Sequence, residues 1–230
     1  MEVQVWFVHL DDVSVDEACC YRLLSSDEQN RAGRFAFCDD RRRYIASHAI
    51  LRSVLASHLL VLPEELQFSK GLNGKPALTT IPGHPRVEFN LSHSEGMALI
   101  AVARERQVGV DVEWVRHDFP FVEVARRFFS AEEAAGLIAQ PSRSQRLAFY
   151  QCWTAKEALA KAKGTGLDGK PNGIEIIRTG DDIVRVKSTM PGWILAELRP
   201  GHGYVGAVAI EDEECEVRCF QWEALHAFWR

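Results

Sequence analysis

The stretch that decides the fold is Val108-Gly109-Val110-Asp111-Val112-Glu113-Trp114, in which two acids interrupt small and branched apolar residues. Side chains two positions apart point to one face of a strand, so Asp111 and Glu113 lie together, about 7 Å apart. Two like charges on an apolar strand repel each other and resist transfer out of water. A hard cation such as Mg²⁺, which prefers oxygen ligands, removes both penalties. The alternative is a strand edge whose polar face is in water, and this stretch alone leaves both open.

The composition is that of a globular protein with a local site. The 230 residues suffice for a sizeable core, as one domain or as two small halves. The net charge of −5 argues against broad binding to nucleic acid or to an anionic membrane. The N-terminal residues 1–8 alternate like a strand, so we expect no targeting or membrane segment.

The cysteines indicate a reducing compartment. No two of them form a C-x-x-C pair, and several lie in apolar surroundings typical of buried thiols. We therefore expect a cytoplasmic protein. The six are Cys19, Cys20, Cys38, Cys152, Cys215 and Cys219.

The apolar pattern predicts an α+β chain. Each half contains a long helix and strands, which suits a duplicated unit divided into residues 1–106 and 107–230. We expect strands at 3–9, 89–94, 97–103 and 108–114, with the last two as hairpin partners, and antiparallel strands at 174–178, 183–187, 193–198, 204–210 and 216–222. We expect helices at 14–24, 41–60, 122–128, 132–139 and 145–163, the second of them capped by Asp39 and Asp40.

The helix at 145–163 carries a second candidate site. Its apolar stripe contains Ala148, Cys152, Ala155, Leu159 and Ala162. Nearly opposite lie Tyr150 and Trp153 with Glu157 and Lys161, which are four residues apart. A solvated ion pair is the simple explanation, but large aromatic neighbours favour a covered face, where a charged pair needs partners.

Several cations stand in positions suited to an anionic ligand. The Ser25-Ser26-Asp27-Glu28 segment has a capping pattern and opens a short helix carrying Arg31. Arg43 lies in an arginine triplet near the start of the next helix, where the dipole disfavours cations. Lys75 lies in a glycine-rich turn, and His93 follows Ser92 at a strand end. Each of these residues, taken singly, is also consistent with a solvated or locally satisfied side chain.

Together these acids, cations and glycine loops predict a metal-assisted reaction at phosphate. In order and spacing, five motifs closely resemble the surfactin-type 4′-phosphopantetheinyl transferases, up to about residue 170. The motifs are Gly74-Lys75-Pro76, Phe89-Asn90-Leu91-Ser92-His93-Ser94, Gly109-Val110-Asp111-Val112-Glu113, Arg127-Phe128-Phe129-Ser130-x-x-Glu133, and Trp153-Thr154-Ala155-Lys156-Glu157-Ala158-x-x-Lys161 with Gly164-x-Gly166-Leu167.

The resemblance implies an α+β fold of two similar halves related by a pseudo-two-fold axis, with coenzyme A in the cleft between them. It implies Mg²⁺, or Mn²⁺, on Asp111, Glu113, Glu157 and the coenzyme A pyrophosphate. The phosphopantetheine arm would pass to a serine of an apo acyl or peptidyl carrier protein, releasing adenosine 3′,5′-bisphosphate. Such carriers serve fatty-acid, polyketide or non-ribosomal peptide synthesis.

The resemblance also assigns roles to single residues. Glu157, directly or through a metal-bound water, is the candidate base for the serine, with Asp111 and Lys161 completing the catalytic set. Lys161 can reach the pyrophosphate as a point charge. The residues matching positions that hold the nucleotide and its 3′-phosphate are Arg31, Arg43, Lys75, Ser92 and His93. Related sequences often carry a lysine where this chain has Glu28, so one phosphate contact is in question.

The partner is expected to be a small acidic helical bundle that docks around residues 119–129, where Arg126 and Arg127 supply positive charge. An internally duplicated chain can complete its cleft as a monomer. Two other classes of protein are alternatives to a transferase. In a Mg²⁺-dependent nuclease the lysine usually follows the second acid by two positions on the same strand, whereas here Lys161 lies four residues beyond Glu157 on a helix. The acidic net charge also argues against a DNA surface. A non-catalytic nucleotide-binding module has no need of Glu157.

Overall fold

The computed structural model describes residues 2–11, 16–71, 74–166, 174–179, 183–188 and 190–223. The helices are α1 (Glu17–Leu23), α2 (Ser26–Ala32), α3 (Cys38–Leu59), α4 (Phe121–Phe128), α5 (Ala131–Ile138) and α6 (Ser142–Lys163), with a 3-10 turn η1 (Pro63–Glu65). The strands are β1 (Glu2–His9), β2 (Phe68–Lys70), β3 (Pro76–Leu78), β4 (Val87–Ser94), β5 (Met97–Arg104), β6 (Val108–Trp114), β7 (Ile174–Thr179), β8 (Ile183–Ser188), β9 (Ile194–Leu198), β10 (Tyr204–Ile210) and β11 (Glu216–Gln221). The expected mixture of helices and strands is confirmed.

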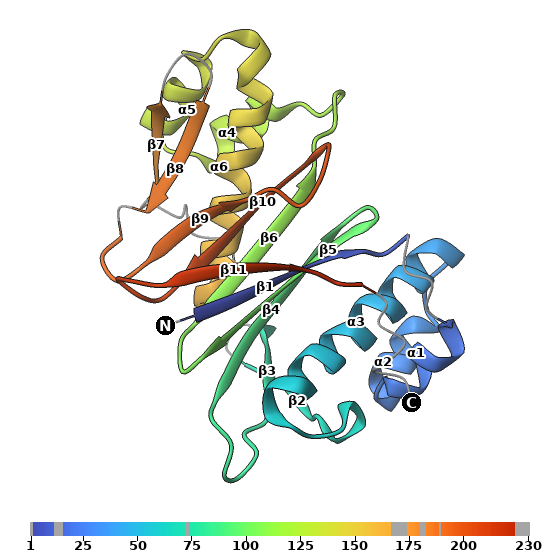
Figure 1. The fold of residues 1–230 in the computed structure, drawn as a ribbon. Coiled ribbons are helices and arrows are strands. Elements are labelled where there is room, and N and C mark those ends of the chain that lie inside the picture. The colour runs from blue at the N-terminus through green and yellow to red at the C-terminus, as the bar shows by residue number, and fades with distance from the viewer. Residues whose placement is uncertain are drawn as a thin grey trace.

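Two main sheets lie between two long helices. One sheet has the strand order β11-β1-β5-β4 and the other has the order β6-β10-β9. Figure 1 shows α3 on one side of the strands and α6 on the other. The pairs β2-β3 and β7-β8 form two separate two-stranded sheets.

The sequence of β5 explains the layering. Every residue from Met97 to Ala103 is buried, so the strand is apolar on both faces. Its odd-numbered residues pack against the valines of β6 and β10, which joins the two sheets face to face. Its even-numbered residues pack against the apolar side of α3, including Ile50 and Val54. A separate cluster joins α6 to the outer face of the second sheet.

Two expectations about strand pairing are wrong. The strand at 108–114 does not form a hairpin with 97–103; β6 pairs with β10 in the second sheet, and β5 pairs with β1 and β4. The last strand, β11, is parallel to β1, not antiparallel to its sequence neighbours. Both pairings are between segments distant in sequence, which local apolar alternation cannot specify. The division into residues 1–106 and 107–230 stays a prediction.

The start of the first long helix also differs from expectation. The helix α3 begins at Cys38, and its N-cap Phe37 makes no side-chain cap, so Asp39 and Asp40 lie within the first turn. Their negative charges still favour the helix dipole there. The expectations for residues 14–15, for 72–73 in the loop before Lys75 and for 167–173 after α6 lie outside the described residues.

Candidate active site

The acidic face of β6 is turned toward α6. A Cβ at Gly109 would collide with the backbone of Ala158 and Ala162, so strand and helix are in close contact at this point. Further along β6, Asp111 is buried with 3% of its surface exposed, and Glu113 is half-buried. Burial therefore places both carboxylates in a setting where each needs a compensating partner.

Side chains of β4 join the two sheets along β6. The side-chain amide oxygen of Asn90 accepts a hydrogen bond from the Val110 N–H (2.9 Å), and Ser94 Oγ accepts one from the Trp114 N–H (3.1 Å). Ser92 Oγ donates to Asp111 Oδ1 at 2.9 Å. These three residues alternate along β4, so all of them face β6. Sequence reasoning missed Asn90 as a site residue, although a polar amide within an apolar strand was a visible signal.

The helix α6 supplies the rest of the cluster. Its apolar stripe is buried as expected, and the opposite face is covered as well, with Tyr150 buried and Trp153, Glu157 and Lys161 half-buried. The ammonium of Lys161 lies 2.6 Å from Asp111 Oδ1 and 2.9 Å from the Ser92 hydroxyl. The structure thus brings one residue from each of β4, β6 and α6 into direct contact.

The charge of Asp111 raises the pKa of both other carboxylates, Glu113 and Glu157. Burial, followed by the charge of Asp111, raises the pKa of Glu157 to about 7. Burial and Asp111 likewise raise the pKa of Glu113, against hydrogen bonds from Ser94 and Trp153. Burial raises the pKa of Asp111 although Lys161 and Ser92 oppose it. Since Glu157 also feels the charge of Glu113, the three acids from β6 and α6 form one electrostatic cluster.

The chemistry of this cluster fits a cation, although its side chains are not yet arranged as a formed metal site. Asp111 Oδ2 is a buried oxygen without a hydrogen-bond partner, which is costly for a carboxylate. Within the described ranges, however, no group of three or more His, Cys, Asp or Glu side chains is placed to hold a metal ion as it stands. Lys161 takes up one oxygen of Asp111 in this arrangement. The donor set is therefore suitable for Mg²⁺, and the acidic side chains must turn to share it.

A basic region lies beside the acids. Arg31 on α2 stands over the ring of Tyr44, 5.6 Å from its centroid, and is exposed. Partial burial, the charge of Lys161 and the charge of Arg31 all lower the pKa of His93. His93 therefore interacts electrostatically both with Lys161, beside the acids, and with Arg31 on α2.

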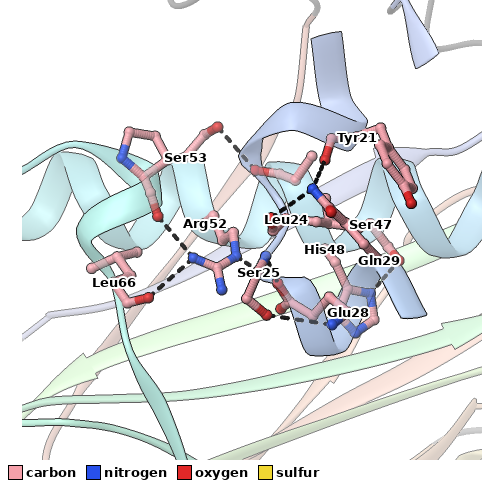
Figure 2. Close-up of polar contacts among 12 residues, drawn as sticks. Tyr21, Leu24, Ser25, Glu28, Gln29, Ser47, His48, Arg52, Ser53 and Leu66 are labelled. Atoms are coloured by element: carbon pink, nitrogen blue, oxygen red, sulfur yellow. Dashed lines mark hydrogen bonds and ion pairs between the residues drawn. The ribbon is translucent and has the colours of Figure 1, made fainter. Parts of the chain in front are cut away.

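Glu28, the residue that stands in place of a lysine, has a structural partner. Its carboxylate accepts from Arg52 Nε at 2.8 Å and from the Ser25 N–H at 2.8 Å, completing the expected capping box of α2. Figure 2 shows Arg52 reaching from α3 between the start of α2 and the carbonyl of Leu66. Glu28 therefore fixes the helix that carries Arg31, and it is not a phosphate contact.

Two further predicted cations already have partners. The guanidinium of Arg43 forms a two-point ion pair with Asp11, at 2.8 Å and 2.7 Å. A phosphate that binds Arg43 must displace this carboxylate or share the cation with it. The ammonium of Lys75 contacts two backbone carbonyl oxygens, those of Val108 and Ala162.

A buried ion pair supports α6 behind the acids. Lys156 Nζ lies 2.8 Å from Glu133 Oε2, with side chains that are 1% and 7% exposed. The same carboxylate accepts from the Ser130 N–H, so Glu133 closes the capping box of α5. Motif residues adjacent in sequence thus divide their roles: Lys156 joins α6 to α5, whereas Glu157 interacts with the charges of Asp111 and Glu113.

Comparisons with known proteins agree with this site. A family model described as the 4′-phosphopantetheinyl transferase superfamily matches residues 107–209. A second, described as the N-terminal part of a 4′-phosphopantetheinyl transferase, matches residues 14–105. The chain belongs to the 4′-phosphopantetheinyl transferase superfamily and is an enzyme of this class.

Individual relatives carry the same description. The 4′-phosphopantetheinyl transferase HetI of Nostoc sp. is 39% identical over 209 residues, covering 91% of this chain and 87% of the relative. The 4′-phosphopantetheinyl transferase Sfp of Bacillus subtilis is 28% identical over 207 residues, covering 88% of this chain and 89% of the relative. The resemblance to surfactin-type enzymes is confirmed, and the nuclease and non-catalytic alternatives find no support here.

Among the described helices, none is both long and apolar enough to cross a membrane.

Proposed function

We propose that this chain transfers the 4′-phosphopantetheine arm of coenzyme A to a serine hydroxyl of an apo acyl or peptidyl carrier protein, with Mg²⁺ or Mn²⁺ as cofactor. The observation that carries the proposal is the electrostatic cluster of Asp111, Glu113 and Glu157 beside Lys161. Three acids with raised pKa values and one buried, unpartnered carboxylate oxygen favour a bound cation together with a polyanionic ligand.

Asp111, Glu113 and Glu157 are the residues that would hold the metal. When bound, Mg²⁺ neutralises the pyrophosphate and the negative charge that develops on the leaving group. Ser92 fixes the orientation of Asp111 from β4, and Ser94 and Trp153 fix that of Glu113. These hydrogen bonds keep the carboxylates in place while a ligand enters.

The reaction forms one P–O bond and breaks another. The carrier serine oxygen attacks the phosphorus next to the pantetheine arm, and the bond to adenosine 3′,5′-bisphosphate breaks. Glu157, directly or through a water molecule, takes the serine proton. Lys161 then pairs with the departing phosphate as a cation on a flexible stem. Arg31 and His93 bind the nucleotide end, where the 3′-phosphate supplies the matching charge.

The carrier surface is proposed to involve the outer side of α4. Arg126 and Arg127 are exposed there, whereas Phe129 is buried and Phe128 is half-buried. An acidic helical carrier protein complements these arginines. Arg126→Glu should raise the KM for carrier severalfold without changing the KM for coenzyme A. The matched control is Arg104→Glu, an exposed arginine at the end of β5, and an unaltered KM for carrier in Arg126→Glu would remove α4 from the interface.

The cellular setting remains part of the same proposal. All six cysteines lie among the described residues and none forms a disulfide, which supports a reducing, cytoplasmic location. We expect a monomer, because acids and cations from both halves of the chain meet without a second copy. Sedimentation at catalytic concentrations checks this expectation.

The decisive test of the activity is direct. The protein is incubated with coenzyme A, Mg²⁺ and an apo carrier protein, and the carrier is weighed by mass spectrometry. A gain of about 340 Da, the phosphopantetheine modification, is expected. No gain across a panel of fatty-acid, polyketide and peptide carriers contradicts the proposal, and the pattern of modified carriers identifies the pathway.

A further inference from the structure

Lys75 connects two elements that both belong to the catalytic framework. Its ammonium donates to the carbonyl oxygen of Ala162 at 2.9 Å and to that of Val108 at 3.1 Å. Lys75 lies in the segment between β2 and β3, whereas its acceptors lie 87 and 33 residues further along the chain. A lysine at a loop tip is ordinarily solvated, yet this side chain is half-buried and burial lowers its pKa.

The first acceptor belongs to the last turn of α6. The final carbonyl oxygens of a helix have no partner within it and need donors from elsewhere. The N–H groups of Gly164 and Thr165 bond to the carbonyls of Ala160 and Lys161. The carbonyl of Ala162 receives the Lys75 ammonium, whose positive charge also suits the negative end of the helix dipole.

The second acceptor lies at the start of β6, on the strand edge that does not pair with β10. Along this edge the N–H groups of Val110 and Trp114 bond to side chains of β4. The Val108 carbonyl bonds to Lys75, so side chains from the first half of the chain serve all three of these positions. Next to Val108, Gly109 is in close contact with the backbone of Ala162.

We infer that Lys75 is a positioning residue, which fixes the last turn of α6 to the first residue of β6 and so holds Glu157 and Lys161 opposite Asp111 and Glu113. The same ammonium binds both elements at the place where they touch. The inference rests on the proposed function only for the roles of these acids and of Lys161. It assigns Lys75 to the catalytic framework in place of the nucleotide phosphates.

Hydrogen–deuterium exchange tests, without any substrate, whether Lys75 fixes the last turn of α6 to β6. Lys75→Met keeps the aliphatic stem and removes the donors, so exchange at residues 162–166 should become about tenfold faster. The control is Lys70→Met, which removes an exposed lysine from β2 and should leave α6 protected. Lys75→Arg, which retains the charge and the donors, should restore most of the protection. It keeps the test valid if Lys75→Met folds poorly.

Kinetics separates positioning from ligand binding. A misplaced helix should lower kcat of Lys75→Met about 10- to 100-fold. The KM for coenzyme A should stay within about twofold, with the same ratio for dephospho-coenzyme A. Wild-type exchange in α6 overturns the inference whatever the activity, as does a rise in KM confined to coenzyme A. Failure of the wild-type protein to modify any carrier, with the exchange result as expected, contradicts the proposed function alone.

Discussion

Lys156→Met tests how strongly the enclosed ion pair stabilises the catalytic helix. The substitution leaves the Glu133 carboxylate only 7% exposed and without its cation, and it removes an ammonium that lies 5.3 Å from the Phe129 ring centroid. Removing one partner of a buried pair costs about 3–5 kcal/mol, because the other charge stays buried. For a chain of this size that corresponds to a fall in Tm of roughly 6–20 °C. Denaturant unfolding and calorimetry at pH 7 measure both quantities.

A double variant and an exposed control separate the effect of the Lys156–Glu133 ion pair from that of the surrounding packing. Glu133→Met/Lys156→Met removes both charges, and its stability should return to within about 2 kcal/mol of wild type, the remainder reflecting the lost cap of α5. Lys70→Met, on an exposed position, should change stability by less than about 0.5 kcal/mol. A loss below about 1 kcal/mol for Lys156→Met would refute the reasoning, since a buried carboxylate cannot lose its cation at so small a cost.

Three further predictions concern the acids and the basic region. Glu157→Gln should fold as wild type and lose transfer activity, and wild-type turnover would exclude Glu157 as base or ligand. His93→Ala should raise the KM for coenzyme A more than that for dephospho-coenzyme A; an equal rise would disconnect His93 from the 3′-phosphate. His48, enclosed near Glu28, His93 and Arg31, has its pKa lowered to about 4, chiefly by burial. The folded pKa of His48 lies below the unfolded value. The stability that the neutral ring contributes is therefore present above about pH 6.5 and is lost as the pH falls toward 4. Between pH 7 and pH 5 the wild type should lose about 2 kcal/mol more than His48→Gln, and parallel curves would contradict a neutral buried ring.

Local periodicity was enough to predict the two elements that carry the acids. The alternation in Val108–Trp114 correctly placed Asp111 and Glu113 on one face, because side-chain direction in a strand depends only on its period. The aromatic residues around Glu157 correctly indicated that both sides of α6 are covered. Both inferences used information contained within a single element.

Relations between distant segments were not accessible from one sequence. Pairing of β6 with β10 and of β11 with β1 depends on which apolar faces meet in the folded chain. The acceptors of Lys75 are backbone carbonyls, which carry no signal in the side-chain pattern. The pairing of Arg43 with Asp11 depends on the path of the chain after β1, and residue type alone could not distinguish it from a phosphate contact.

The central claim is that acids from β6 and α6 share one divalent cation with a bound pyrophosphate. Titration of the protein with Mn²⁺, followed by electron paramagnetic resonance in the presence of coenzyme A, measures this directly. We expect a single tightly bound Mn²⁺ per chain that competes with Mg²⁺ and is lost in a folded Asp111→Asn variant. Equal Mn²⁺ binding by wild type and Asp111→Asn, or no binding by either, would contradict the account.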